Sequence, residues 1–231
     1  MAEQIAESAS ASCPGVDIRI LFLNGDDNRL TGGALPRPAN GAQPSPQAVI
    51  VPLLAGPHPV IDAAIDAAVS QAPGLVMLAA HLGPHPLLAG AVHDRLSEVG
   101  LARAGRARGL NIAAGASGVL LIADRGPQAI SDAGVTAVLL AARLAIPVVP
   151  ASLGDPASVS NALDRLREAG ASHLAIAPCV IGPETEPAAF DQLSAAIGAP
   201  CAPPLGSHPA IAQLVAIRYG EALARISIPS H

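Results

Sequence analysis

Short apolar runs alternate with segments of helical periodicity along most of the chain. Apolar runs that end at turn-forming residues predict buried strands, and apolar residues recurring every three or four positions predict amphipathic helices. The predicted strands are 18–23, 48–54, 75–80, 118–123, 146–151, 173–180 and 200–203. The predicted helices are 59–71, 86–99, 127–144, 156–169, one between the last two strands, and 209–224. Strands that alternate with helices in this way predict right-handed βαβ units and parallel sheets.

The second half of the chain repeats the first. Residues 82–89 match residues 205–212 at an offset of 123 positions, and residues 51–58 match residues 177–184 at an offset of 126. The opening strands of the two halves match only at an offset of 100, so the first half lacks roughly one βα unit. We therefore expect an α/β protein with two similar halves, each a parallel sheet flanked by helices, of which the first is shortened.

The composition of the segments suggests where these halves begin and end. A polar, Ser- and Ala-rich start predicts a flexible leader over 1–15, followed by the shortened half over 16–104. An Arg-, Gly- and Ala-rich stretch predicts a linker over 105–117. The second half then covers 118–225, and 226–231 forms a tail.

The amino-acid composition excludes a disordered protein and argues against a protein that binds nucleic acids. Of 231 residues, 51% are hydrophobic and 13% are charged, which is enough for a large core and excludes global disorder. The chain has no Trp, one Tyr and two Phe, so aromatic platforms for bases are not expected. Its net charge of −5 and pI of about 5.7 argue against nucleic acid as a partner.

Targeting and redox features point to a soluble cytoplasmic protein. The uncharged run 72–92 is long enough for a membrane span, but Pro84-His85-Pro86 breaks any such helix. The first residues show neither a basic nor an apolar signal-peptide region. The three cysteines have no paired spacing, which argues against a disulfide framework or a thiolate zinc site.

Candidate site residues follow from the strand ends, because parallel sheets bind ligands beyond the carboxyl ends of their strands. No nucleotide-binding or serine-hydrolase motif is present, so no organic cofactor is expected. The polar residues at those ends are Asn24, His58, His81, His85, Asp124, Glu184 and His208.

Three histidines share one context, since His58, His85 and His208 each precede a proline at the start of a helix. They are either turn residues whose rings fill gaps or residues of a site, because histidine is not a favoured helix cap. Neutral imidazole binds divalent metals, which makes His58 the first candidate ligand. Its repeat mate Glu184 could bind metal or accept a proton, or could be a solvated carboxylate in the first turn of a helix.

Together these segments resemble the sirohydrochlorin chelatase family, the class II metal chelatases of the cobalamin and sirohaem pathways. The resembling segments are VIVPLLAGPHPVIDAAI (49–65), LGPHPLLAGAVHDRL (82–96), PASVSNALDRLREAGASHLAIAPCVI (156–181) and APPLGSHPAIAQLVAIRYGEAL (202–223). The resemblance implies two α/β halves with a cleft between them, and it makes His58 the counterpart of one metal-facing histidine of the family.

The sequence also departs from the family pattern. The family's other metal-facing histidine lies in a His-Gly-Ser turn after the first strand, where this chain has Asn24. The matching position of the second half is Asp124, and the position matching His58 is Glu184. The resemblance therefore points to a degenerate member of the family.

Two functions follow from the resemblance. The first is insertion of a divalent metal (Co²⁺, Fe²⁺ or Ni²⁺) into a carboxylated tetrapyrrole. The second is a non-catalytic homologue that binds tetrapyrrole or metal, alone, as a homo-oligomer or with a partner chelatase. In the first, His58 binds metal or accepts a proton and is assisted by Glu184. The substrate would meet Asn24, His85, Asp124, Arg125 and His208.

Overall fold

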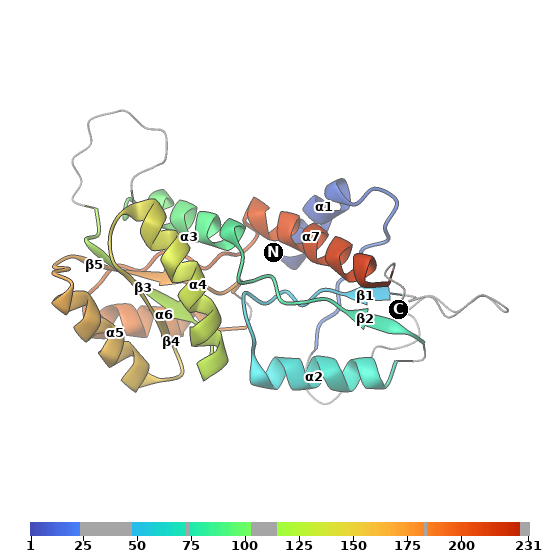
Figure 1. Ribbon diagram of the computed structural model, residues 1–231, viewed down its shortest axis with the longest axis horizontal. Helices are drawn as coiled ribbons and strands as arrows, with labels where there is room; N and C mark the ends of the chain where they lie inside the picture. Colours follow the sequence, from blue (N-terminus) through green and yellow to red (C-terminus); the bar gives the residue numbers. More distant parts are fainter. Residues whose placement is uncertain (24–47, 73, 103–114, 183, 227–231) are drawn as a thin grey trace.

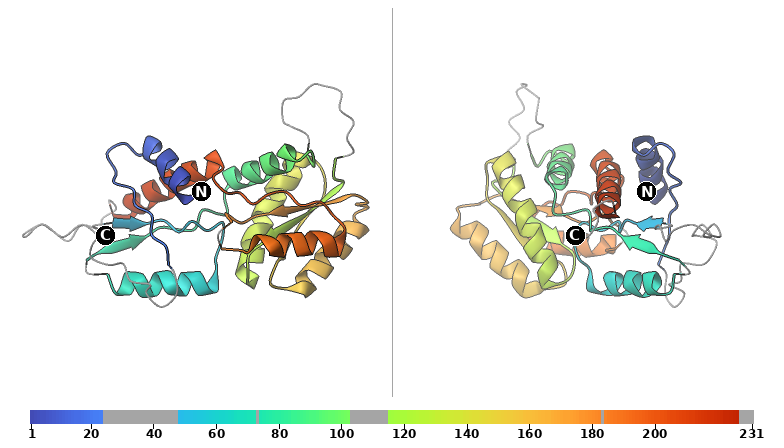
Figure 2. Two further views of the ribbon diagram at one scale, coloured as in Figure 1. Left: turned by 180° about the vertical axis from the view of Figure 1, so that it is seen from behind. Right: turned by 45° about the vertical axis from the view of Figure 1, so that its right-hand side comes forward.

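The computed structural model of the protein has two lobes side by side (Figures 1 and 2). Asn24 and most of the predicted linker lie outside the part of the chain that the structure describes. The described residues are 1–23, 48–72, 74–102, 115–182 and 184–226.

The larger lobe contains a three-stranded parallel sheet in the order β4-β3-β5, formed by β3 (Gly118–Ala123), β4 (Val148–Ser152) and β5 (Leu174–Pro178). Residues near Cys201, predicted as a strand, add only a single parallel bridge to Ile176. The helices that follow these strands are α4 (Pro127–Leu144), α5 (Pro156–Glu168) and α6 (Pro187–Ile197).

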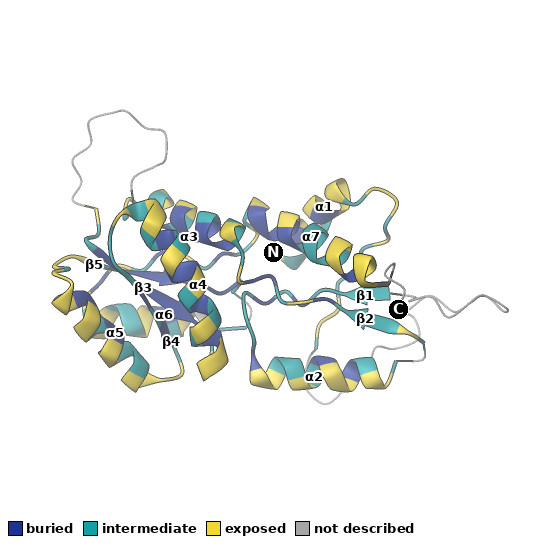
Figure 3. Cartoon of the chain, viewed as in Figure 1, coloured by how far each residue is buried: buried dark blue, intermediate teal, exposed yellow. Residues whose placement is uncertain are grey.

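Strand β3 is buried along its whole length because helices cover both faces of the sheet (Figure 3). Val119 and Leu121 belong to one apolar cluster, whereas Leu120 and Ile122 belong to another. This division follows from the alternation of side chains along a strand. The uninterrupted apolar run of β3 is therefore the sequence of a central parallel strand.

The smaller lobe contains a two-stranded parallel sheet, β1 (Ala48–Ile50) and β2 (Val76–Leu78). Helix α2 (Pro59–Ser70) covers one face, and α1 (Ala2–Ser12) lies with α7 (Pro209–Ile226) on the other side (Figure 1). The predicted strand at 18–23 is wrong. Leu21 and Phe22 are 44% and 68% exposed, so this apolar run does not enter a buried sheet.

The structure also differs from the prediction at the first residues. The segment predicted as a flexible leader contains helix α1. Ile5 and Ala9 are one helical turn apart and both are buried. Helix α1 packs against α7 (Figure 2). The alanine-rich start of the chain is thus an amphipathic helix, whose few apolar positions are used for packing.

The two halves of the chain exchange a helix. Helix α3 (Pro86–Glu98), from the first half, packs on α4 and β5 of the larger lobe. Helix α7, from the second half, packs on β1 and α1 of the smaller lobe. Neither lobe is therefore a continuous stretch of chain.

Matching contacts fix this exchange. Arg95 of α3 donates to the carbonyl oxygen of Leu205 over 2.6 Å, and Arg218 of α7 donates to that of Leu82 over 3.1 Å. Both pairs of residues are related by the sequence offset of 123. The equivalence supports an internal duplication, which stays a prediction.

The observed architecture confirms the α/β class with parallel sheets flanked by helices. Among the described helices, none combines the length and apolar character needed to cross a membrane.

Candidate functional site

A pocket lies where the ends of β3 and β5 meet the loop between β1 and α2. The empty space between its walls is about 370 Å³, counted together with the open solvent at its mouth. The polar side chains that line it are Asp124, Asp132, Thr136, Cys179 and Glu184. Backbone of Leu54–Pro57 completes the wall on the side of the smaller lobe. The pocket is thus built from both lobes at the carboxyl ends of parallel strands, where ligands bind in such sheets.

Asp124, which follows β3, has one satisfied and one unsatisfied carboxylate oxygen. Its Oδ1 accepts a hydrogen bond of 2.8 Å from the backbone N–H of Arg125. Its Oδ2 is shielded from solvent and has no hydrogen-bond partner among the described residues. A buried oxygen without a partner is costly, so Oδ2 is a ready acceptor for a cation or for an N–H group.

His58 faces this oxygen from the smaller lobe. Its side chain is 9% exposed, and its Nε2 lies 3.5 Å from Asp124 Oδ2. His58 is also the N-cap of α2, because its Nδ1 accepts a hydrogen bond of 3.2 Å from the backbone N–H of Ile61.

The capping bond fixes the protonation state of the His58 ring. A neutral imidazole has one acceptor nitrogen and one N–H. Since Nδ1 accepts the bond from Ile61, the proton of the neutral ring is on Nε2 and points to Asp124. A metal ion can bind Nε2 only if this proton leaves and the cap at Ile61 is broken.

Two glycines shape the loops around the pocket. Gly126 has φ of +107°, a conformation that favours glycine, and the position of a Cβ there lies 3.5 Å from Pro59 at the start of α2. A Cβ on Gly83 would overlap the carbonyl oxygen of Ala55 in the pocket wall. The turn after Asp124 therefore lies against the start of α2, and the loop of Gly83 lies against Ala55 within the smaller lobe.

Glu184 is the second carboxylate in the part of the pocket lining that the larger lobe supplies. Its carboxylate accepts hydrogen bonds from the backbone N–H groups of Ile181 and Gly182. Burial raises its pKa above the ordinary value, and the nearby charge of Asp124 raises it further, although the backbone hydrogen bonds act in the other direction. A carboxyl group with this raised pKa can hold and release a proton closer to neutral pH.

Cys179 is a pocket residue that the sequence analysis did not select. Burial raises the pKa of its thiol to about 12, so it remains protonated at neutral pH. Its side chain forms part of the pocket wall and does not supply a thiolate ligand. Its position directly after β5 was the signal in the sequence that could have selected it.

The other predicted residues lie elsewhere. None of His58, His85 and His208 is among the residues that line the pocket. His85 and His208 cap α3 and α7, because their Nδ1 atoms accept hydrogen bonds from the backbone N–H groups of Leu87 and Ala210. The Nε2 of His208 lies 3.4 Å from a carboxylate oxygen of α3. All three Gly-x-His-Pro histidines thus act as helix caps in the described structure, and of these only His58 faces Asp124.

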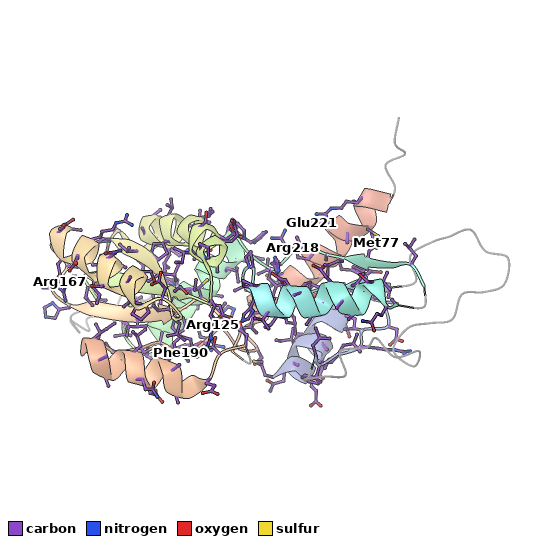
Figure 4. The ribbon with its side chains drawn as sticks, turned by 90° about the horizontal axis from the view of Figure 1, so that it is seen from below. Met77, Arg125, Arg167, Phe190, Arg218 and Glu221 are labelled. Atoms are coloured by element: carbon purple, nitrogen blue, oxygen red, sulfur yellow. The ribbon has the colours of Figure 1, made fainter. Side chains whose placement is uncertain are left out.

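Arg125 is exposed and lies at the junction of the lobes (Figure 4). Its side chain packs near Gly154, beside the turn that carries Asp124. Asn24 lies outside the described residues.

The pocket is not a preformed metal cage. Across the described ranges, no three His, Cys, Asp or Glu side chains converge to hold a metal ion. His58 and Asp124 supply one imidazole and one carboxylate, a donor set suited to borderline divalent metals such as Co²⁺ and Fe²⁺. The remaining ligands would come from the substrate or from water.

Comparison with known proteins gives a match by fold only. No family model and no curated protein sequence matches the chain. The structure of SirB from Bacillus subtilis with Fe³⁺ superposes with a TM-score of 0.62 and 19% identity, over 98% of this chain and 90% of that one. The sirohydrochlorin chelatase SirB from Bacillus subtilis subspecies spizizenii, in complex with cobalt, gives 0.57 and 17% over the same shares. The chain therefore has the chelatase fold of SirB.

Proposed function

We propose that this protein inserts a divalent metal into a carboxylated tetrapyrrole, as a sirohydrochlorin chelatase-like enzyme of cobalamin or sirohaem biosynthesis. Cobalt and iron are the first candidate metals and nickel is the third. The observation that carries the proposal is the pairing of His58 with the unsatisfied Oδ2 of Asp124, across the two lobes of a chelatase fold.

The chemistry of insertion fits this pair. A metal ion enters the macrocycle as M²⁺, and two pyrrole N–H protons leave as the metal–nitrogen bonds form. Asp124 Oδ2 is the open acceptor for the metal ion or for a pyrrole proton. Glu184, with its raised pKa, is the second group that can take a proton and pass it to solvent.

His58 has two states in this scheme. As the cap of α2 it holds a proton on Nε2 and orients the carboxylate of Asp124. When the bond from Ile61 is broken, Nε2 becomes free to bind the metal. We therefore expect metal binding to loosen the first turn of α2.

The substrate would lie over the mouth of the pocket. The pocket is small beside a tetrapyrrole, so it would receive the metal and the reacting pyrrole edge while the macrocycle lies across both lobes. Arg125, which is exposed at the junction of the lobes, would meet a peripheral carboxylate. Asn24, His85 and His208 remain candidate substrate contacts. We also propose a cytoplasmic location.

The test is anaerobic incubation with sirohydrochlorin and Co²⁺ or Fe²⁺, followed by the absorbance change of metal insertion. The wild-type protein is compared with His58→Ala and with a reaction without protein. Insertion above background that falls in the variant supports the proposal. A rate equal to background for every metal refutes it.

A non-catalytic homologue is the second candidate function. The observation that favours it is the lack of a three-ligand cluster in the described parts of the chain. In that case the macrocycle spectrum shifts on binding, and no insertion follows.

A further inference from the structure

A chain of hydrogen bonds runs from α7 to the backbone of His58, on the side away from Asp124. It begins at Arg218, whose Nε donates to the carbonyl oxygen of His81 over 2.7 Å. The ring of His81 then pairs through Nε2 with Asp62 Oδ1 over 2.9 Å. Asp62 Oδ2 finally accepts the backbone N–H of His58 over 2.9 Å.

The last bond closes a reciprocal cap at the start of α2. His58 Nδ1 accepts from the backbone of the third helical residue, while Asp62, one residue further, reaches back to the backbone N–H of His58. This is the arrangement of a capping box, with histidine and aspartate in place of the usual residues. It fixes both the position of the His58 backbone and the orientation of its ring.

Asp62 and His81 are placed to act only through His58. Their side chains are 29% and 27% exposed, and neither lines the pocket. Each oxygen of Asp62 is used, one by the ring of His81 and one by the backbone of His58. An aspartate bonded on both sides in this way has little freedom to turn.

We infer that Asp62 and His81 are positioning residues that hold His58 with Nε2 toward Asp124. The inference rests on the proposed function for its effect on metal, and on the geometry alone for its effect on the ring of His58. Through Arg218, the helix that crosses from the other half of the chain is part of the same support.

The experiment compares variants that keep or remove each hydrogen bond. Asp62→Leu and His81→Leu remove the support, whereas Asp62→Asn keeps an acceptor and His81→Gln keeps an N–H donor. Asp66→Leu is the matched control, because it removes the same charge one turn further along α2 at an exposed position.

The first readout is the ¹⁵N NMR signal of the His58 ring in metal-free protein at pH 8. We expect wild type, Asp66→Leu and both conservative variants to show one tautomer, with the proton on Nε2. We expect the two leucine variants to show a mixture of tautomers. The inference is overturned if both leucine variants keep the single tautomer, or if the wild type lacks it.

The second readout is Co²⁺ affinity from visible absorption. The support favours the capped ring with its proton on Nε2, which a metal ion must displace. We therefore expect Co²⁺ to bind His81→Leu more tightly than the wild type, by on the order of 10-fold, and His81→Gln with the wild-type affinity. Equal affinity in both variants overturns the inference.

Failure of the proposed function gives a different result. If no form binds Co²⁺ while the leucine variants still change the tautomer, the positioning role stands and the proposed function fails. If Asp62→Leu does not fold, the His81 variants decide the question, because His81 lies after β2 and outside the helix.

Discussion

Substitution of Asp124 by asparagine should stabilise the protein and inactivate it. The shape of the side chain is retained, and the new amide oxygen still accepts the N–H of Arg125. The charge disappears from a shielded oxygen that accepts no hydrogen bond from the described residues and lies 3.5 Å from His58 Nε2. Its repulsion of Glu184 disappears as well.

The size of the effect follows from these contacts. A buried polar atom without a partner costs about 1–3 kcal/mol, and a charged one costs more. The asparagine N–H group that replaces Oδ2 is itself poorly paired, since it faces the N–H of His58. We therefore expect a net gain of about 1 kcal/mol in the free energy of unfolding at pH 8.

The assay is thermal unfolding followed by circular dichroism, together with metal insertion. A gain of about 1 kcal/mol corresponds to roughly 2–4 °C in a chain of this size. Removal of a group that accepts a proton in the reaction typically lowers the rate by about 10²-fold or more. Asp155→Asn is the control, because asparagine caps α5 as well as aspartate does. A less stable Asp124→Asn protein, or one that inserts metal at the wild-type rate, would refute the reasoning.

Three further predictions concern single groups. Gly83→Ala should lower the unfolding temperature, because its Cβ overlaps the carbonyl oxygen of Ala55, whereas Gly134→Ala, with open space around it, should raise stability by up to about 1 kcal/mol. The pKa of His85 is lowered, chiefly by burial, so stability should fall as the pH drops below 6.5; His85→Asn should keep the cap and lose this dependence in a series of melting curves. The pKa of Glu184 is raised, so the wild type should lose stability relative to Glu184→Gln as the pH rises from about 4.5 through the raised pKa; a constant difference would contradict the shift.

Much of the fold was predictable from the sequence, because the larger lobe follows local rules. The strand 118–123 and the helix 127–144 occur at the predicted residues, since β3 is apolar throughout and a glycine and a proline mark the start of α4. The apolar run 18–23 was wrongly predicted as a strand. Leu21 and Phe22 are exposed, and an apolar run without a covering layer does not form a buried strand. The exchange of α3 and α7 has no local signature, since it depends on contacts more than 100 residues apart.

The candidate site was predictable in part. Asp124 and Glu184, which were selected by their positions after strands, both line the pocket, while their roles stay predictions. The same criterion grouped His58 with two histidines that only cap helices in the described structure, because one sequence pattern serves both purposes. The role of Asp62 depends on a side chain reaching back one turn to a backbone N–H, and it becomes visible only when the loop of His81 is in place.

The most direct test of the account is a double-mutant cycle on the rate of Co²⁺ insertion into sirohydrochlorin. His58→Ala, Asp124→Asn and the double variant are compared with the wild type. If the pair works as one unit across the lobes, each single variant loses most of the rate and the double variant loses little more. Losses that multiply, or a wild type that inserts no metal above the reaction without protein, would contradict the account.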